Sequence, residues 1–144
     1  MIDNYLKLKE KNLVTFEKEE VVVCILRNKK GDIILQKKTL DYKKAPGQWC
    51  LFGGQAESKD LNKEMKRELR EELGMRLNPK FIFTKKIKAR NKNIIFYVFL
   101  EKINDLSKIK LGEGAGFALF DKKELKNLNI APEIKMVLKE YFKK

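Results

Sequence analysis

Hydrophobic residues gather in short runs along this chain, and polar or turn-forming residues separate the runs. The first run, residues 20–27, is apolar and rich in β-branched residues, which predicts a buried strand. Turn-forming residues follow at 28–32, and residues 33–38 are expected to form the second strand of a hairpin. A short apolar run also lies at 49–52. The pattern predicts further strands at 81–84, 93–99 and 117–120, and a turn at 90–93.

One segment has helical spacing. Between residues 60 and 73 there is no proline or glycine, and apolar residues recur every fourth position from Leu61 to Leu73. This spacing places them on one stripe of a helix. Asp60 is expected to cap the start of the helix, and Gly74 is expected to end it.

The end of the chain predicts a helical turn at residues 121–125 and an amphipathic helix at 132–142. Strands and helices are mixed without regular alternation, which predicts an α+β fold with a mixed sheet and helices on its faces. A length of 144 residues suits one domain spanning residues 1–144. With 37% charged residues, no bilayer-spanning apolar run and no readable signal peptide, we expect a cytoplasmic protein without a membrane partner.

The composition narrows the possible chemistry. Histidine is absent, which rules out serine–histidine and cysteine–histidine catalysis. Cys24 and Cys50 form no CxxC motif and are expected to be reduced core residues. The net charge of +13 indicates either a polyanionic partner, such as nucleotide phosphates or RNA, or a generally lysine-rich surface. Chemistry is therefore left to carboxylates, lysines, hydroxyls or a metal held by oxygen ligands.

The predicted helix carries an acidic cluster in this otherwise basic chain. At about 100° per residue, Glu64, Glu68, Glu71 and Glu72 share one sector of roughly 100° beside the apolar stripe. Like charges this close repel, and Arg67 can neutralise part of the charge through Glu71, four residues on. A solvated acidic face is one interpretation, and a bound Mg²⁺ or Mn²⁺ is the other, since these ions prefer oxygen ligands.

Residues 67–75, Arg-Glu-Leu-Arg-Glu-Glu-Leu-Gly-Met, resemble the second half of the Nudix box. The family consensus is Gly, five residues, Glu, seven residues, then Arg-Glu-apolar-any-Glu-Glu-any-Gly-apolar. The front half departs from it, because Lys59 stands at the glutamate position when Gly53 leads. A box shortened by one residue, with Gly54 leading and Asp60 in the acidic position, is the alignment we prefer. It predicts that Asp60 pairs with Arg67.

The resemblance covers roughly residues 21–142 and is to MutT-like Nudix hydrolases. It implies the Nudix fold, a mixed β-sheet sandwiched between α-helices. It also implies Mg²⁺-dependent cleavage, with Mn²⁺ as an alternative ion, of a phosphoanhydride bond in a nucleoside diphosphate linked to another group. The expected substrate is a (deoxy)nucleoside triphosphate or a related nucleotide.

The resemblance also implies roles for individual residues. Gly53, through its carbonyl, and Glu68, Glu71 and Glu72 would hold the metal. The general base would be Glu68, Glu71 or Glu113, and the sequence does not decide among them. Lys38 and Arg27 would face the substrate phosphate, while Arg67, Asp60 and Gly74 would be structural.

Two other functions stay open at this stage. One is a Nudix-fold module that binds a nucleotide or RNA without hydrolysing it, which the altered front half and the +13 charge leave possible. The other is hydrolysis at RNA ends, for which the chain has no separate motif. The intact Arg-Glu-any-any-Glu-Glu core favours the nucleotide hydrolase.

Overall fold

The computed structural model describes residues 17–89, 92–112 and 114–144. Helices and strands follow the chain order β1 (Glu17–Arg27), β2 (Ile33–Lys37), β3 (Trp49–Cys50), β4 (Phe52–Gln55), α2 (Leu61–Leu73), β5 (Lys80–Ala89), β6 (Lys92–Lys102), the 3₁₀ turn η1 (Leu106–Lys108), β7 (Gly116–Phe120), α3 (Lys122–Lys126) and α4 (Pro132–Lys143). The expected mixture of strands and helices is confirmed.

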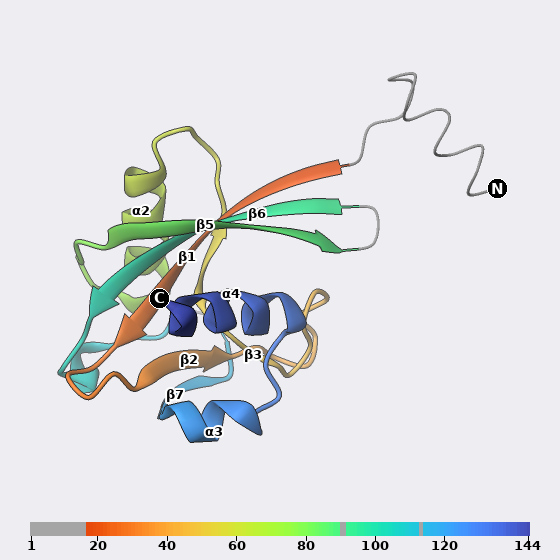
Figure 1. Ribbon diagram of the computed structural model, residues 1–144. Coiled ribbons are helices and arrows are strands. Elements are labelled where there is room, and N and C mark those ends of the chain that lie inside the picture. The colour runs from red at the N-terminus through yellow and green to blue at the C-terminus, as the bar shows by residue number, and fades with distance from the viewer. Residues whose placement is uncertain (1–16, 90–91, 113) are drawn as a thin grey trace, which may run out of the picture.

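The strands in this part of the chain form one seven-stranded mixed sheet (Figure 1). Its main path is β3-β2-β1-β6-β5, with β4 paired to β1 and β7 paired to β2. The central strand β1 runs parallel to β6 and antiparallel to β2 and β4. Its end pairs with β2, at Leu26 with Ile34, whereas its middle pairs with β4, at Val23 with Gly53. The β1–β2 hairpin is therefore confirmed, but it is short.

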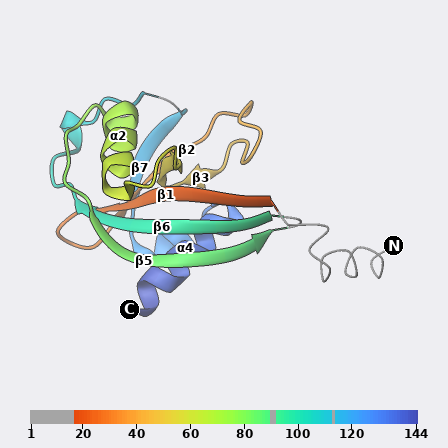
Figure 2. The ribbon, with the colours of Figure 1, turned by 90° about the horizontal axis from the view of Figure 1, so that it is seen from above.

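Helices α2 and α4 lie on opposite faces of the sheet (Figure 2). Successive side chains of β1 point to opposite faces, as in any strand. Val22 and Cys24 therefore join the core beneath α2, and Val23 and Ile25 join the core beneath α4. Two hydrophobic cores thus clamp the sheet from both sides.

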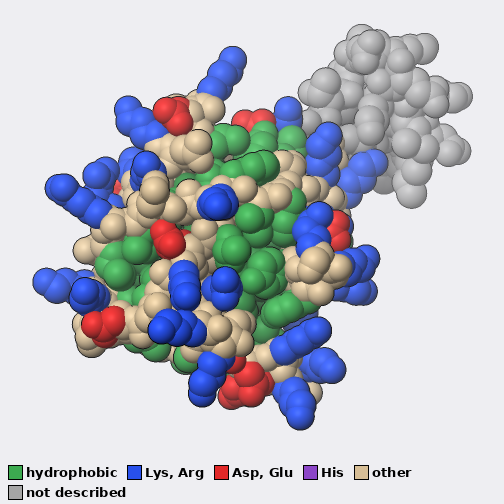
Figure 3. Space-filling view, turned by 60° about the vertical axis from the view of Figure 1, so that its left-hand side comes forward, with side chains coloured by type: hydrophobic (Ala, Val, Ile, Leu, Met, Phe, Trp, Pro, Cys, Tyr) green, Lys and Arg blue, Asp and Glu red, His purple; other side chains and the backbone are tan. Residues whose placement is uncertain are grey.

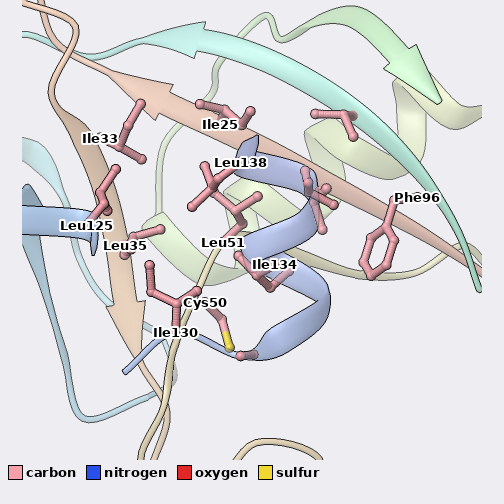
Figure 4. Close-up of a cluster of buried hydrophobic side chains, with 14 of the residues drawn as sticks. Ile25, Ile33, Leu35, Cys50, Leu51, Phe96, Leu125, Ile130, Ile134 and Leu138 are labelled. Atoms are coloured by element: carbon pink, nitrogen blue, oxygen red, sulfur yellow. The ribbon is translucent and has the colours of Figure 1, made fainter. Parts of the chain in front are cut away.

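The core beneath α4 brings together segments that are distant in sequence (Figure 4). Side chains from β1, β2, β3, the β3–β4 junction, β6, α3 and the start and middle of α4 contribute to this core. The labelled members are Ile25, Ile33, Leu35, Cys50, Leu51, Phe96, Leu125, Ile130, Ile134 and Leu138. This core fixes α4 and the β3–β4 junction on the same side of β1.

Helix α2 has the predicted start and end. The Asp60 side chain accepts a hydrogen bond from the Lys63 backbone N–H at 3.2 Å. Gly74 has a left-handed conformation with φ 67°, and its N–H donates to the Arg70 carbonyl at 2.9 Å. This geometry favours glycine at the helix end. Both capping predictions are confirmed.

Several boundaries differ from the expected ones. Strand β5 covers residues 80–89 instead of 81–84, because it is an edge strand whose lysines at 85, 86 and 88 interrupt the apolar pattern. The run at 49–52 divides into β3 and β4. Of the predicted turn at 90–93, Arg90 and Asn91 lie outside the described residues.

The expectation for the two cysteines is confirmed, since Cys24 and Cys50 are free and buried. In the part of the chain that the structure describes, no helix has the length and apolar character needed to cross a membrane.

Candidate active site

The α2 helix packs directly against Gly53 and Gly54 in strand β4. Gly54 pairs with Val22 of β1, so this part of β4 is held by the sheet. A Cβ atom on Gly54 would lie only 2.7 Å from Oε1 of Glu68. The absence of a side chain at Gly54 therefore allows a carboxylate of α2 to reach the backbone of this strand.

Glu72 is buried at the inner side of the same helix, with 5% of its surface exposed. Its Oε1 accepts a hydrogen bond from Nε2 of Gln36 at 3.4 Å. Its Oε2 is buried and has no hydrogen-bond partner among the described residues. Burial raises the pKa of Glu72 from 4.5 to about 8, and the nearby positive charge of Lys38 opposes this shift only in part.

Glu68 lies one helical turn before Glu72 and is partly buried. Burial raises the pKa of Glu68, and the charge of Arg67 acts in the opposite direction. The negative charge of Glu68 adds to the rise in the pKa of Glu72. The charges of Glu71 and Glu57 add to the rise in the pKa of Glu68. A cation between Glu68 and Glu72 would offset both the cost of burying the two charges and the repulsion between them.

Arg67 is the centre of the acidic cluster. Its Nη2 lies 2.7 Å from Glu64 and 3.1 Å from Glu68, and its Nη1 lies 3.1 Å from Glu71. A fourth carboxylate, that of Glu57, lies 3.6 Å away in the loop before α2. The prediction that Arg67 neutralises part of the acidic face is confirmed.

The predicted pair between Asp60 and Arg67 is wrong. Among the described residues, the carboxylates paired with Arg67 come from α2 itself and from Glu57. Asp60 is occupied as the helix cap, and it lies seven residues away, a rise of about 10 Å along the helix axis. Glu57 supplies the loop carboxylate that the alignment had assigned to Asp60.

A cleft of about 540 Å³ opens beside Gly53 and Gly54 of β4. Its walls come from β1, the segment at 38–45, the β3–β4 junction, β6 and the start of α4. Lys38 lines the cleft, and its Nζ lies 4.5 Å from the ring centroid of Tyr42. The charged lining consists of Lys38, Lys43, Lys44, Lys92, Glu19 and Glu133. This lining gives the cleft a net positive charge.

The remaining basic side chains are spread widely. On the face shown in Figure 3, Lys and Arg side chains project from many places around exposed hydrophobic side chains, with few acidic ones among them. The basic character is thus general over this face, and the cleft adds a concave site to it.

The structure brings together only part of the predicted site. Gly53, Glu68 and Glu72 lie together, and Lys38 lines the adjoining cleft. Glu71 is exposed and faces Arg67.

Arg27 is not brought to the cleft. It lies at the end of β1, about 13 Å along the strand from Val23, and its guanidinium donates to the Asn28 carbonyl at 3.3 Å. The strand order places Lys38 at the other end of β2, so the two basic residues do not share a site. Glu113 lies outside the described residues.

Sequence reasoning missed Gln36 and Glu57. Gln36 is a single polar residue at the end of the buried run Ile33–Leu35, and this isolation is the signal that could have identified it. Glu57 stands in a polar loop, where nothing distinguishes it from its neighbours.

The side chains that could bind a metal at this site are carboxylates, and their oxygen atoms are the ligands that hard divalent cations take. Among residues 17–89, 92–112 and 114–144, no three or more His, Cys, Asp or Glu side chains are arranged so that they could hold a metal ion by themselves. The unpartnered Oε2 of Glu72 nevertheless lies buried beside Glu68, with the Gly53 backbone close by. Two neighbouring carboxylates are oxygen donors that Mg²⁺ and Mn²⁺ accept. The residues present fit such an ion.

A mixed sheet between helices is the architecture that the Nudix resemblance implied. The NUDIX domain family matches residues 17–141. The chain therefore belongs to the Nudix family, and the resemblance and the fold expected from it are confirmed.

Curated relatives match part of the chain. The nucleoside triphosphatase NudI of Klebsiella pneumoniae is 38% identical over 60 residues, which are 42% of this chain and 43% of that protein. The protein of the same name from Escherichia coli is 39% identical over 61 residues, with the same shares. The match thus spans less than half the length of these relatives.

Solved structures match nearly the whole fold. The MutT protein of Methanosarcina mazei Go1 has a TM-score of 0.75 at 21% identity, covering 90% of this chain and 96% of that chain. The MutT Nudix hydrolase of Burkholderia pseudomallei has a TM-score of 0.68 at 20% identity, covering 85% and 97%. At this level of identity the likeness concerns the fold.

Proposed function

We propose that this protein hydrolyses a phosphoanhydride bond of a nucleotide with the help of Mg²⁺, or of Mn²⁺ in its place. The observation that carries the proposal is the buried carboxylate of Glu72. It lies one helical turn after Glu68, on the part of α2 that packs against Gly53 and Gly54 of β4. A buried carboxylate with an unpartnered oxygen is costly to ionise without a cation. Family membership and the resemblance to nucleoside triphosphatases support the same activity.

Glu68, Glu72 and the Gly53 carbonyl would hold the ion, with Glu71 as a further, exposed carboxylate on the same helix. The ion would neutralise charge on the phosphate oxygens and make water more acidic. Arg67 keeps the carboxylates of α2 close together by donating to Glu64, Glu68 and Glu71. The protein would therefore hold these carboxylates side by side on α2 before the ion binds.

The substrate would lie in the cleft beside this cluster. Lys38 would contact a phosphate, because it lines the cleft and its charge reaches Glu72. Tyr42 and Phe96 also line the cleft and would offer apolar contact to a nucleobase. The chemical class that these residues suit is a (deoxy)nucleoside triphosphate or a related nucleotide.

Glu68 is the described residue that best suits the role of general base. Its Oε1 accepts a hydrogen bond from Arg67 at 3.1 Å, which leaves its Oε2 to accept a proton from water. Glu71 is less suited, since both of its oxygens accept hydrogen bonds from Arg67 at 3.1 and 3.2 Å. Glu113 remains the third candidate from the sequence.

A screen of nucleotides with Mg²⁺, measuring release of phosphate and pyrophosphate, tests the proposal. We expect hydrolysis of at least one nucleoside triphosphate, and loss of hydrolysis in excess EDTA. Nucleotide binding without hydrolysis of any substrate would contradict the proposal and would favour the binding module. Hydrolysis that persists in EDTA would contradict the metal requirement.

A further inference from the structure

Gln36 is a polar residue in a position that β2 otherwise fills with apolar side chains. The three residues before it, Ile33 to Leu35, are fully buried, and Gln36 is itself 0% exposed. A buried amide destabilises the fold unless its polar atoms are hydrogen-bonded. Its presence therefore calls for an explanation beyond packing.

The amide nitrogen of Gln36 joins two parts of the site. Nε2 donates to the Leu51 carbonyl at 3.2 Å and to Oε1 of Glu72 at 3.4 Å. The Leu51 carbonyl can only accept, which makes the NH₂ group the side of the amide that faces both partners. Gln36 thus ties the Glu72 carboxylate to the rigid backbone between β3 and β4.

The other side of the amide faces the segment that leads into β7. A Cβ atom on Gly114 would lie 3.3 Å from Oε1 of Gln36 and 3.0 Å from the Lys37 carbonyl. The same segment is fastened to both neighbours, since Ala115 N–H donates to Lys37 at 2.8 Å and Gly112 N–H donates to the Glu72 carbonyl at 2.8 Å. Gln36 is therefore enclosed on both sides and has little freedom to turn.

We propose that Gln36 is a positioning residue for Glu72. By donating to Oε1, it fixes the carboxylate so that Oε2 is the oxygen left for a cation. The buried Oε2, without a hydrogen-bond partner in the described part of the chain, is the observation that favours this division of roles. The inference rests on the proposed metal-dependent hydrolysis and adds to it a residue that does not touch the substrate.

The test compares Gln36→Met, which keeps the length of the side chain but cannot donate, with the wild-type protein. Ile34→Val is the matched control, because Ile34 is buried on the same strand and contacts the core beneath α2. Gln36→Asn, one methylene shorter, keeps an amide that cannot span both acceptors. Gln36→Asn replaces Gln36→Met in the comparison if Gln36→Met does not fold. Mn²⁺ affinity is measured by calorimetry without substrate, and kcat and KM are then measured with a nucleotide.

We expect the Gln36 variants to bind Mn²⁺ about 10-fold or more weakly, as losses of groups that orient a metal ligand commonly do. At saturating Mn²⁺, kcat should fall while KM for the nucleotide changes less than about twofold, because Gln36 acts through Glu72. Ile34→Val should change neither quantity. Folded Gln36 variants with wild-type Mn²⁺ affinity would overturn the inference alone. A wild-type protein that binds no Mn²⁺ would overturn both the inference and the proposed function.

Discussion

The guanidinium of Arg67 lies 2.7 Å from the buried carboxylate of Glu64, one turn earlier on α2. The hydrogen bond from Arg67 lowers the pKa of Glu64, which favours the ionised form of this buried group. The same guanidinium contacts Glu68 and Glu71. One arginine thus makes an acidic helix face compatible with folding before any cation binds.

Replacing Arg67 with Met should therefore destabilise the protein. Glu64 would be left buried without its partner, and the repulsion among the glutamates would be unopposed. We expect the melting temperature to fall by roughly 4 °C or more. Lys66→Met, at an exposed neighbouring position, is the control and should change it little. Equal melting temperatures for the two variants would show that Arg67 is not the neutralising group.

The Asp60 cap makes a second prediction. Asp60→Ala removes the acceptor for the Lys63 N–H and should lower the free energy of unfolding by about 1 kcal/mol. Lys59→Ala should have no effect, since Lys59 is exposed. Urea unfolding of the two variants measures both values. Damage from Lys59→Ala together with a silent Asp60→Ala would restore the alignment in which Gly53 leads the box.

The fold and the position of the acidic helix could be predicted because they depend on local patterns. The spacing of Leu61, Met65, Leu69 and Leu73 predicts the helix, and Asp60 and Gly74 predict its ends. The contact of Arg67 with Glu71 could be predicted from their spacing, but its contact with Glu57 could not, since that depends on how the loop before α2 folds. The contact between Gln36 and Glu72 joins residues 36 positions apart, which only the packed sheet brings together.

The two basic residues of the first hairpin should differ in their effect on substrate binding, because Lys38 lines the cleft and Arg27 does not. Lys38→Met should raise KM for the nucleotide by about 10-fold, because a contact with a phosphate is lost; this factor corresponds to roughly 1.4 kcal/mol. Lys37→Met is the control, as Lys37 is exposed and does not line the cleft. Arg27→Met should also leave KM unchanged. A rise in KM for Arg27→Met but not for Lys38→Met would contradict the position of the substrate.

The stability of the metal-free protein should depend on pH through Glu72. Its pKa is about 8 in the folded protein and near 4.5 in the unfolded chain. Between these values the folded protein keeps a proton that the unfolded chain has lost, so this contribution to stability falls as pH rises from 4.5 to 8. Glu72→Gln cannot titrate there and should lose less stability over this range. Parallel curves of melting temperature against pH for both proteins, measured in EDTA, would contradict the raised pKa.

The most direct test of the metal-dependent mechanism is the turnover of Glu72→Gln with the best nucleotide from the screen and saturating Mg²⁺. Gln keeps the volume of Glu but lacks the charge that a divalent cation needs. We expect kcat to fall by at least about 10²-fold, a barrier increase of about 2.7 kcal/mol, while the variant stays folded and gains stability without metal. Near wild-type turnover by folded Glu72→Gln across the nucleotides tested would show that the site on α2 is not the active site.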